Sequence, residues 1–106
     1  MTQQDFYNIL TGLNIPVRYD HGEDGLPVPF CYYTFVRATL LNADNKSFAT
    51  FNNAVVNIVA TSKEEINRLT SILEELLSDN DIPFGDPDEG WDEKEKIYLT
   101  TYYLEV

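Results

Sequence analysis

Two long apolar stretches around a short polar one decide the fold: residues 30–40 read FCYYTFVRATL, and residues 48–61 read FATFNNAVVNIVAT. Both stretches are rich in aromatic and β-branched residues, which favour strands. The residues between them include Asn42, Asp44 and Asn45, and these types accept left-handed backbone and bond their own main chain, so they predict a turn. The sequence therefore predicts a long antiparallel hairpin. In its second strand, one face is formed by Ala54, Val56, Ile58 and Ala60.

A helix follows the hairpin directly. Ser62 and Glu65 stand in the spacing of a capping box, in which each side chain satisfies an unpaired amide of the first helical turn. Apolar residues then recur at helical spacing and predict one buried face. These residues are Ile66, Leu69, Ile72, Leu73, Leu76 and Leu77. The helix should end between residues 78 and 81.

Shorter patterns flank this centre. Phe6, Ile9, Leu10 and Leu13 predict a short N-terminal helix, and residues 17–20 a short extended piece. Residues 82–84 are predicted to form a short edge strand, since proline is tolerated at an edge. Residues 85–91 are predicted to form a loop, and residues 96–106 a final strand. The order predicts one α+β domain over residues 1–106, with an antiparallel or mixed sheet of about four strands and two helices packed on it.

Composition limits the classes of partner. The chain has 106 residues, a formal net charge of −11 and 43% hydrophobic residues, which is too apolar for a disordered acidic chain. Its seven basic residues form no stripe that could release counterions from a phosphate backbone. We therefore expect no sequence-specific nucleic-acid binding and no binding to a membrane.

Catalytic patterns are lacking in the sequence. The single histidine, His21, lies in a Gly-rich stretch, and the single cysteine, Cys31, has no basic neighbour in sequence that would activate a thiolate. The acidic stretch 86–93 fails the EF-hand pattern, because Gly90 and Trp91 stand at positions that need a ligand and a turn glycine. We expect no enzyme activity, no cofactor and no metal site.

The acidic residues are concentrated in one region. Residues 74–95 contain ten acids, opposed by Lys94 alone. A solvated surface that keeps the chain soluble is the favoured interpretation. The alternative is a surface that repels polyanions or meets a basic partner. The candidate residues for this second role are Asp86, Asp88, Glu89, Asp92 and Glu93.

The order of these segments carries a resemblance. A tyrosine-rich strand is followed by Ala43-Asp44-Asn45-Lys46, then by a strand ending in Val59-Ala60-Thr61-Ser62-Lys63, a Glu-rich helix and a last strand at Tyr98–Val106. From the first helix to the end, this layout resembles the tail-completion proteins (tail terminators or head–tail joining proteins) of long-tailed phages and prophages of Gram-positive bacteria. The acidic segment that holds Trp91 departs from the simpler polar turn usual in that family.

The resemblance implies a structural virion protein in the tail or neck, assembled in the host cytoplasm. Such proteins form a ring, commonly a hexamer, that caps the head-proximal end of the tail tube, contacts the tube protein and the head–tail connector, and lets DNA pass. The candidate interface residues are Asp44, Asn45, Phe48, Phe51, Tyr98 and Tyr102. The alternative without an interface is that the rings of Phe48 and Phe51 pack into the core of their own subunit.

Two other functions compete with this one. An acidic interaction module, for example a DNA mimic that binds a basic host protein, would present carboxylates at phosphate-like spacing on one convex face. A small metal-dependent enzyme ranks below both. The resemblance does not separate a tail terminator from a head-side stopper or adaptor, because these neighbours share size and layout.

Overall fold

The fold is a five-stranded sheet with two helices. The computed structural model describes the backbone of residues 3–20, 27–41 and 47–106, and the side chains of these residues except 36–41 and 47–52. The elements are α1 (Gln3–Leu10), a 3₁₀ turn (Thr11–Leu13), β1 (Val17–Tyr19), β2 (Phe30–Leu41), β3 (Ser47–Ala60), α2 (Lys63–Asp79), β4 (Asp88–Asp92) and β5 (Ile97–Glu105). The strand order is β1-β2-β3-β5-β4, with β1 parallel to β2 and the other neighbours antiparallel. The predicted α+β class is confirmed, with five strands instead of about four.

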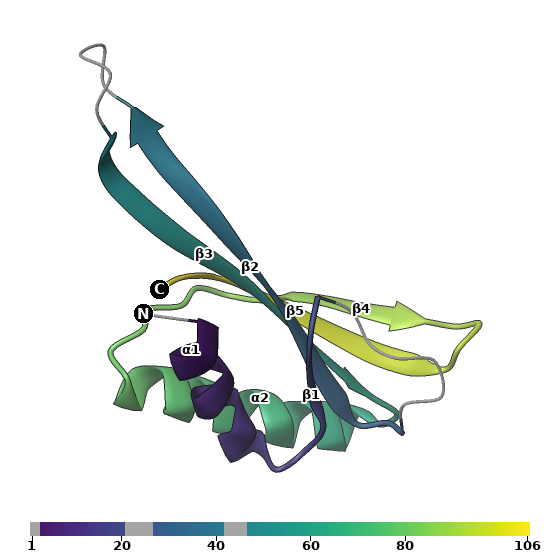
Figure 1. Ribbon diagram of the computed structural model, residues 1–106. Helices are drawn as coiled ribbons and strands as arrows, with labels where there is room; N and C mark the ends of the chain where they lie inside the picture. The colour runs from purple at the N-terminus through teal and green to yellow at the C-terminus, as the bar shows by residue number, and fades with distance from the viewer. Residues whose placement is uncertain (1–2, 21–26, 42–46) are drawn as a thin grey trace.

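Both helices cover the same face of the sheet (Figure 1). The predicted inner face of β3 is confirmed, because Ala54, Val56, Ile58 and Ala60 are fully buried. From α1, the buried ring of Phe6 lies edge-on to Tyr33 of β2, with ring centroids 5.7 Å apart. From α2, the fully buried residues are Leu69, Leu73 and Leu77. The apolar core therefore lies between the helices and one side of the sheet.

The start of α2 follows the predicted cap. Ser62 has extended backbone, and its hydroxyl oxygen accepts a hydrogen bond of 3.1 Å from the backbone N–H of Glu65. The helix then runs to Asp79, where the side-chain amide of Asn80 donates to the carbonyl of Leu76 at 2.8 Å. Both ends of α2 thus satisfy backbone groups that a helix leaves without partners.

Replacing Ser62 with alanine should lower the free energy of unfolding by about 1 kcal/mol, because the N–H of Glu65 loses its acceptor. Urea denaturation followed by circular dichroism measures the change. Ser62→Asp is the matched control, since aspartate keeps a side-chain acceptor at the cap. Equal losses for the two variants would show that the cap contributes nothing.

The predicted strand at residues 82–84 is wrong, and the predicted loop at residues 85–91 is correct only for residues 85–87. Residues 82–84 form no strand; Ile82 is buried, and its N–H donates to the carbonyl of Leu77 at the end of α2, so this segment is tied to the helix. The edge strand is β4, within the predicted loop and beyond it, where Trp91 pairs with Tyr98 in the register with β5. Acids and glycine disfavour strands, but backbone pairing with β5 overrides that preference. Exposed charge is also a usual feature of natural edge strands.

The hairpin of β2 and β3 extends past the rest of the sheet (Figure 1). Strand β3 pairs with β5 only from Asn53 to Ala60, and β2 pairs with β1 only from Cys31 to Tyr33. Within the described residues, the strand segments 37–41 and 47–52, here called the arm, pair only with each other. The radius of gyration is 15.2 Å, against about 13 Å for a compact chain of this length. The arm makes the subunit elongated.

Candidate interaction surface

The face of the sheet opposite the helices is here called the open face. The register aligns its central positions in rows across β2, β3 and β5: Phe30 with Val59 and Leu99, Tyr32 with Asn57 and Thr101, and Thr34 with Val55 and Tyr103. None of these residues is charged. The charged residues lie at the margin: Arg18 is opposite Tyr32 on β1, Asp88 and Asp92 are on β4, and Glu105 is opposite Asn53. The centre of the open face is therefore neutral in a strongly acidic chain.

The middle row of the open face is held by a hydrogen bond. The hydroxyl of Thr101 donates to Oδ1 of Asn57 at 2.7 Å, and Asn57 is largely buried although no helix lies over it. Tyr32 flanks Asn57, and desolvation by burial raises the pKa of its hydroxyl. The hydroxyl of Thr101 and Oδ1 of Asn57 are thus paired with each other within the sheet.

Tyr103 stands out on the open face. It is 64% exposed, the largest exposed fraction among the large hydrophobic side chains that the structure describes. Beside it lies a shallow hollow of about 310 Å³ lined by Asn53, Val55, Tyr103 and Glu105. The hollow sits where β5 ends and β3 continues into the arm. The sequence favoured the strand at residues 98–106 as an interface without singling out Tyr103, although the alternation of β5 places it opposite the buried Tyr102 and Leu104.

The predicted interface residue Tyr102 belongs to the core. Its side chain is 1% exposed, and its hydroxyl donates a hydrogen bond to Oε2 of Glu74 on α2. Desolvation by burial raises the pKa of Tyr102, and the hydrogen bond to Glu74 raises it further. Including Tyr102 in a surface was wrong, because even-numbered positions of β5 face the helices. The aromatic side chain available on this strand is Tyr103.

Tyr98 lies between the core and the surface. Its half-buried ring packs on Trp91 of β4, with ring centroids 4.5 Å apart, and the ammonium of Lys63 lies 5.7 Å from its centroid. Trp91 itself is 46% exposed. Asp44 and Asn45 lie outside the described residues, as do the side chains of Phe48 and Phe51. Their proposed interface role stays a prediction.

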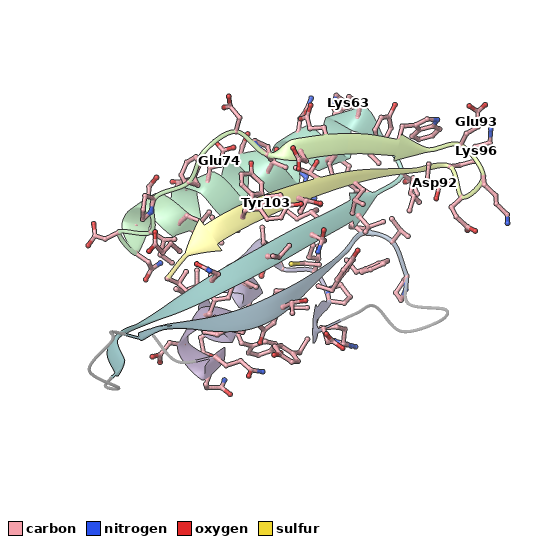
Figure 2. All side chains as sticks on the ribbon, turned by 90° about the horizontal axis from the view of Figure 1, so that it is seen from above. Lys63, Glu74, Asp92, Glu93, Lys96 and Tyr103 are labelled. Atoms are coloured by element: carbon pink, nitrogen blue, oxygen red, sulfur yellow. The ribbon has the colours of Figure 1, made fainter. Side chains whose placement is uncertain are left out.

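The candidate acids do not share one face. They follow one another along the exposed segment from Asp86 through β4 to its turn, and Figure 2 shows Asp92 and Glu93 at that turn. Within β4, Asp88 alternates with Glu89, which faces the helix side and lies 3.8 Å from the ammonium of Lys63. The acids therefore line an edge and a turn of the sheet.

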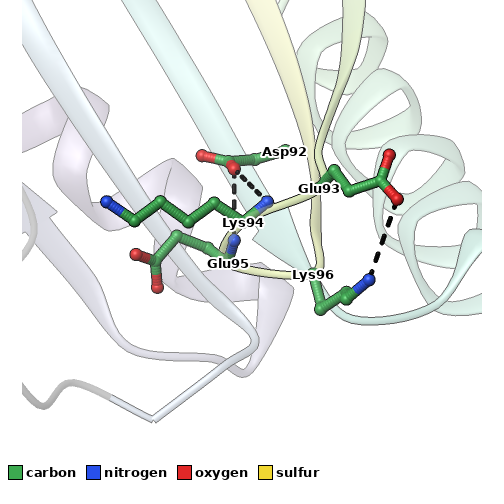
Figure 3. Close-up of polar contacts among 5 residues, drawn as sticks. All are labelled: Asp92, Glu93, Lys94, Glu95 and Lys96. Atoms are coloured by element: carbon green, nitrogen blue, oxygen red, sulfur yellow. Dashed lines mark hydrogen bonds and ion pairs between the residues drawn. The ribbon is translucent and has the colours of Figure 1, made fainter.

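Asp92 has a structural role in the turn between β4 and β5 (Figure 3). Its Oδ1 accepts hydrogen bonds from the backbone N–H groups of Lys94 and Glu95, at 3.0 and 3.1 Å. Lys96 has a φ of 58°, and its ammonium lies 3.9 Å from Glu93. This ion pair is exposed and contributes little to stability. Asparagine at position 92 would keep the acceptor and remove the charge.

Other kinds of site find no support among the described residues. No group of three His, Cys, Asp or Glu residues in that part of the chain could hold a metal ion. None of the described helices has the length and apolar character needed to cross a bilayer. Cys31 is fully buried, and desolvation raises the pKa of its thiol to about 12, so the thiol stays protonated and unreactive at neutral pH.

Comparison with protein-family models finds no match to this chain, and comparison with curated proteins finds none either.

Proposed function

We propose that this protein is a structural subunit that acts by self-association and not by catalysis. More specifically, it is a tail-completion protein: a ring of copies caps the head-proximal end of a phage tail tube and joins it to the head connector. The observation that carries the proposal is the combination of a projecting arm with an open face whose centre is uncharged. The arm extends from the subunit, and the open face offers a surface on which another chain can pack.

Stability arguments support association. A two-stranded ribbon without a covering layer is marginally stable in water. The arm is such a ribbon, and the open face carries apolar rows that no helix covers. Covering both surfaces with further copies of the chain would stabilise the arm and remove apolar area from water. When each subunit joins the next through two different surfaces, the copies form a closed ring if the rotation from one subunit to the next adds up to a full turn.

The charge of the chain supports the passage of DNA. Each copy adds a formal charge of −11, so a ring is strongly acidic. Such a wall binds no phosphates through counterion release, and DNA can move past it without being held. The acids of β4 and its turn are exposed and available for a wall of this kind or for contact with a basic neighbour.

Electron microscopy of the full chain, with and without tail tubes of the same phage or prophage, tests the proposal. A ring with a central hole at one end of each tube supports it. Tubes that stay uncapped at saturating protein would overturn it. Salt-dependent binding to basic host proteins, with no ring, would instead favour the acidic-module alternative.

Neutralising the acids along β4 and its turn should impair DNA transit or docking to the head, while the subunit stays folded. The variant combines Asp86→Asn, Asp88→Asn, Glu89→Gln, Asp92→Asn and Glu93→Gln. Because these side chains are exposed and the asparagine introduced at position 92 keeps the turn acceptor, the free energy of unfolding should change by less than about 1 kcal/mol. The titre of infectious particles measures the functional effect.

The matched control neutralises five acids around α2, namely Glu64, Glu65, Glu75, Asp79 and Asp81. It removes the same charge from another part of the subunit and should leave the titre closer to that of the wild type. A normal titre for the turn variant would refute a role of these acids in transit or docking.

A further inference from the structure

We propose that the arm of one copy packs on the open face of the next copy, with Tyr103 at the centre of the contact. This inference deepens the proposed function, on which it rests, because it assigns the two surfaces through which the ring forms. The contact is heterologous, because the surface that one subunit contributes, the arm, differs from the surface of the next subunit that it covers, the open face.

Charge selects the arm as the occupant. Two bodies that each carry −11 repel one another, so association favours the least acidic part of the chain. Residues 36–52 contain Arg37 and Lys46 against Asp44, a formal net charge of +1, which leaves −12 for the remainder. The hairpin that carries the arm thus lacks the net negative charge that the rest of the chain bears, so it can approach a second copy without charge repulsion.

The receiving surface matches such a segment. The centre of the open face, from Phe30 to Tyr103, is neutral. Its charged residues lie at the margin, and they are Arg18, Asp88, Asp92 and Glu105. The arm contains no acidic residue, so it can cover the centre without bringing a carboxylate onto it, whereas an acidic helix or the β4 edge of a second copy would be repelled at this margin.

Dimensions and shape agree with this arrangement. The arm has strands of five and six residues, roughly 17–20 Å long, and three adjacent strands of the open face span roughly 14 Å. The arm projects beyond both helices (Figure 1), so a second copy can reach it without meeting α1 or α2. The hollow beside Tyr103 gives a recess in the receiving surface. An exposed tyrosine next to a recess is a common anchor of protein interfaces.

The first test is a charge placed at the anchor. Tyr103→Glu should weaken self-association of the full chain at least roughly tenfold, because covering the open face would then bury an unpaired carboxylate. Sedimentation equilibrium measures the association constant. Tyr19→Glu is the matched control: Tyr19 is 43% exposed but lies at the other edge of the sheet, on the helix side. Circular dichroism establishes that both variants fold.

The second test identifies the occupant by disulfide cross-linking between two single-cysteine-addition variants. Tyr103→Cys carries one tag, and Ala49→Cys or Thr50→Cys, neighbouring positions in the arm strand of β3, carries another. The native Cys31 is buried and does not interfere. Gly85→Cys is the control, since residue 85 is exposed and an added side chain meets nothing within 4 Å.

Preferential cross-linking of position 103 to the arm, above the level with position 85, supports the inference. Preferential 103-to-103 linkage would show that open faces stack on each other and would overturn it. So would the absence of any linkage above control, or equal association of Tyr103→Glu and wild type. Arm-to-face linkage without capped tubes would refute the tail role and keep this contact, whereas capped tubes without that linkage would do the reverse.

Discussion

Replacing Leu73 with alanine is expected to lower the free energy of unfolding by about 3 kcal/mol, within the range of about 2–5 kcal/mol for fully buried leucines. Leu73 is fully buried on the middle of α2, in the cluster that joins the helix to the sheet. Alanine removes its apolar contacts and leaves a cavity that the strands cannot close. For a chain of this length, the melting temperature should fall by roughly 12–20 °C.

Ile72→Ala is the matched control for this prediction. Ile72 precedes Leu73 on the same helix but is only partly buried, so its truncation should cost about 1 kcal/mol. Urea unfolding of the two variants at neutral pH gives the comparison. Similar losses at positions 72 and 73 would contradict the packing of α2 described here.

The second large effect expected is a loss of stability at alkaline pH. Burial of Cys31 raises the pKa of its thiol from 9.0 to about 12. The unfolded chain therefore releases this proton from about pH 9, while the folded chain keeps it. The contribution of the protonated thiol to the free energy of unfolding is fully present below pH 9. It is lost as the pH rises towards 12, at about 1.4 kcal/mol per pH unit, or about 4 kcal/mol in total.

Tyrosines add to this loss at higher pH. Desolvation raises the pKa values of Tyr32, Tyr33 and Tyr102 above the ordinary 10.0, so each favours the folded chain less as the pH rises beyond 10. With a typical total stability of about 5–15 kcal/mol, the domain should unfold before all these groups ionise. The pH dependence should steepen above pH 10.

Denaturant unfolding between pH 7 and pH 11 measures this dependence. Cys31→Ala should lower stability at pH 7, because it leaves a small cavity, but should flatten the slope between pH 9 and pH 10. The slope, not the absolute stability, carries the comparison. An unchanged slope in Cys31→Ala would show that the thiol does not cause the loss.

Periodicity and capping predicted the elements whose local signals agree with their surroundings. The alternation along residues 53–60 placed Ala54 and Ile58 on a buried face, and both are buried. The spacing of Ser62 and Glu65 placed the start of α2, where the cap hydrogen bond is found. These signals were sufficient because strand alternation and helix capping are patterns of a few neighbouring residues.

The edge strand could not be predicted in the same way. Residues 88–92 contain three acids and a glycine, a composition with weak strand propensity. Their extended form depends on hydrogen bonds to β5 and on the contact of Trp91 with Tyr98. The same limit applied to Tyr102 and Tyr103, neighbours of similar type, whose environments differ because only one face of the sheet is covered.

The sequence by itself determined the order of elements as far as α2, the inner face of β3, the start of α2 and the acidic character of the chain, because these follow from local pattern and composition. Tertiary structure alone decided that both helices lie on one face, that β4 forms the edge, and that Tyr103 instead of Tyr102 is exposed. Those features depend on which distant backbones pair and which surfaces meet, and such long-range choices are settled by packing of the whole chain.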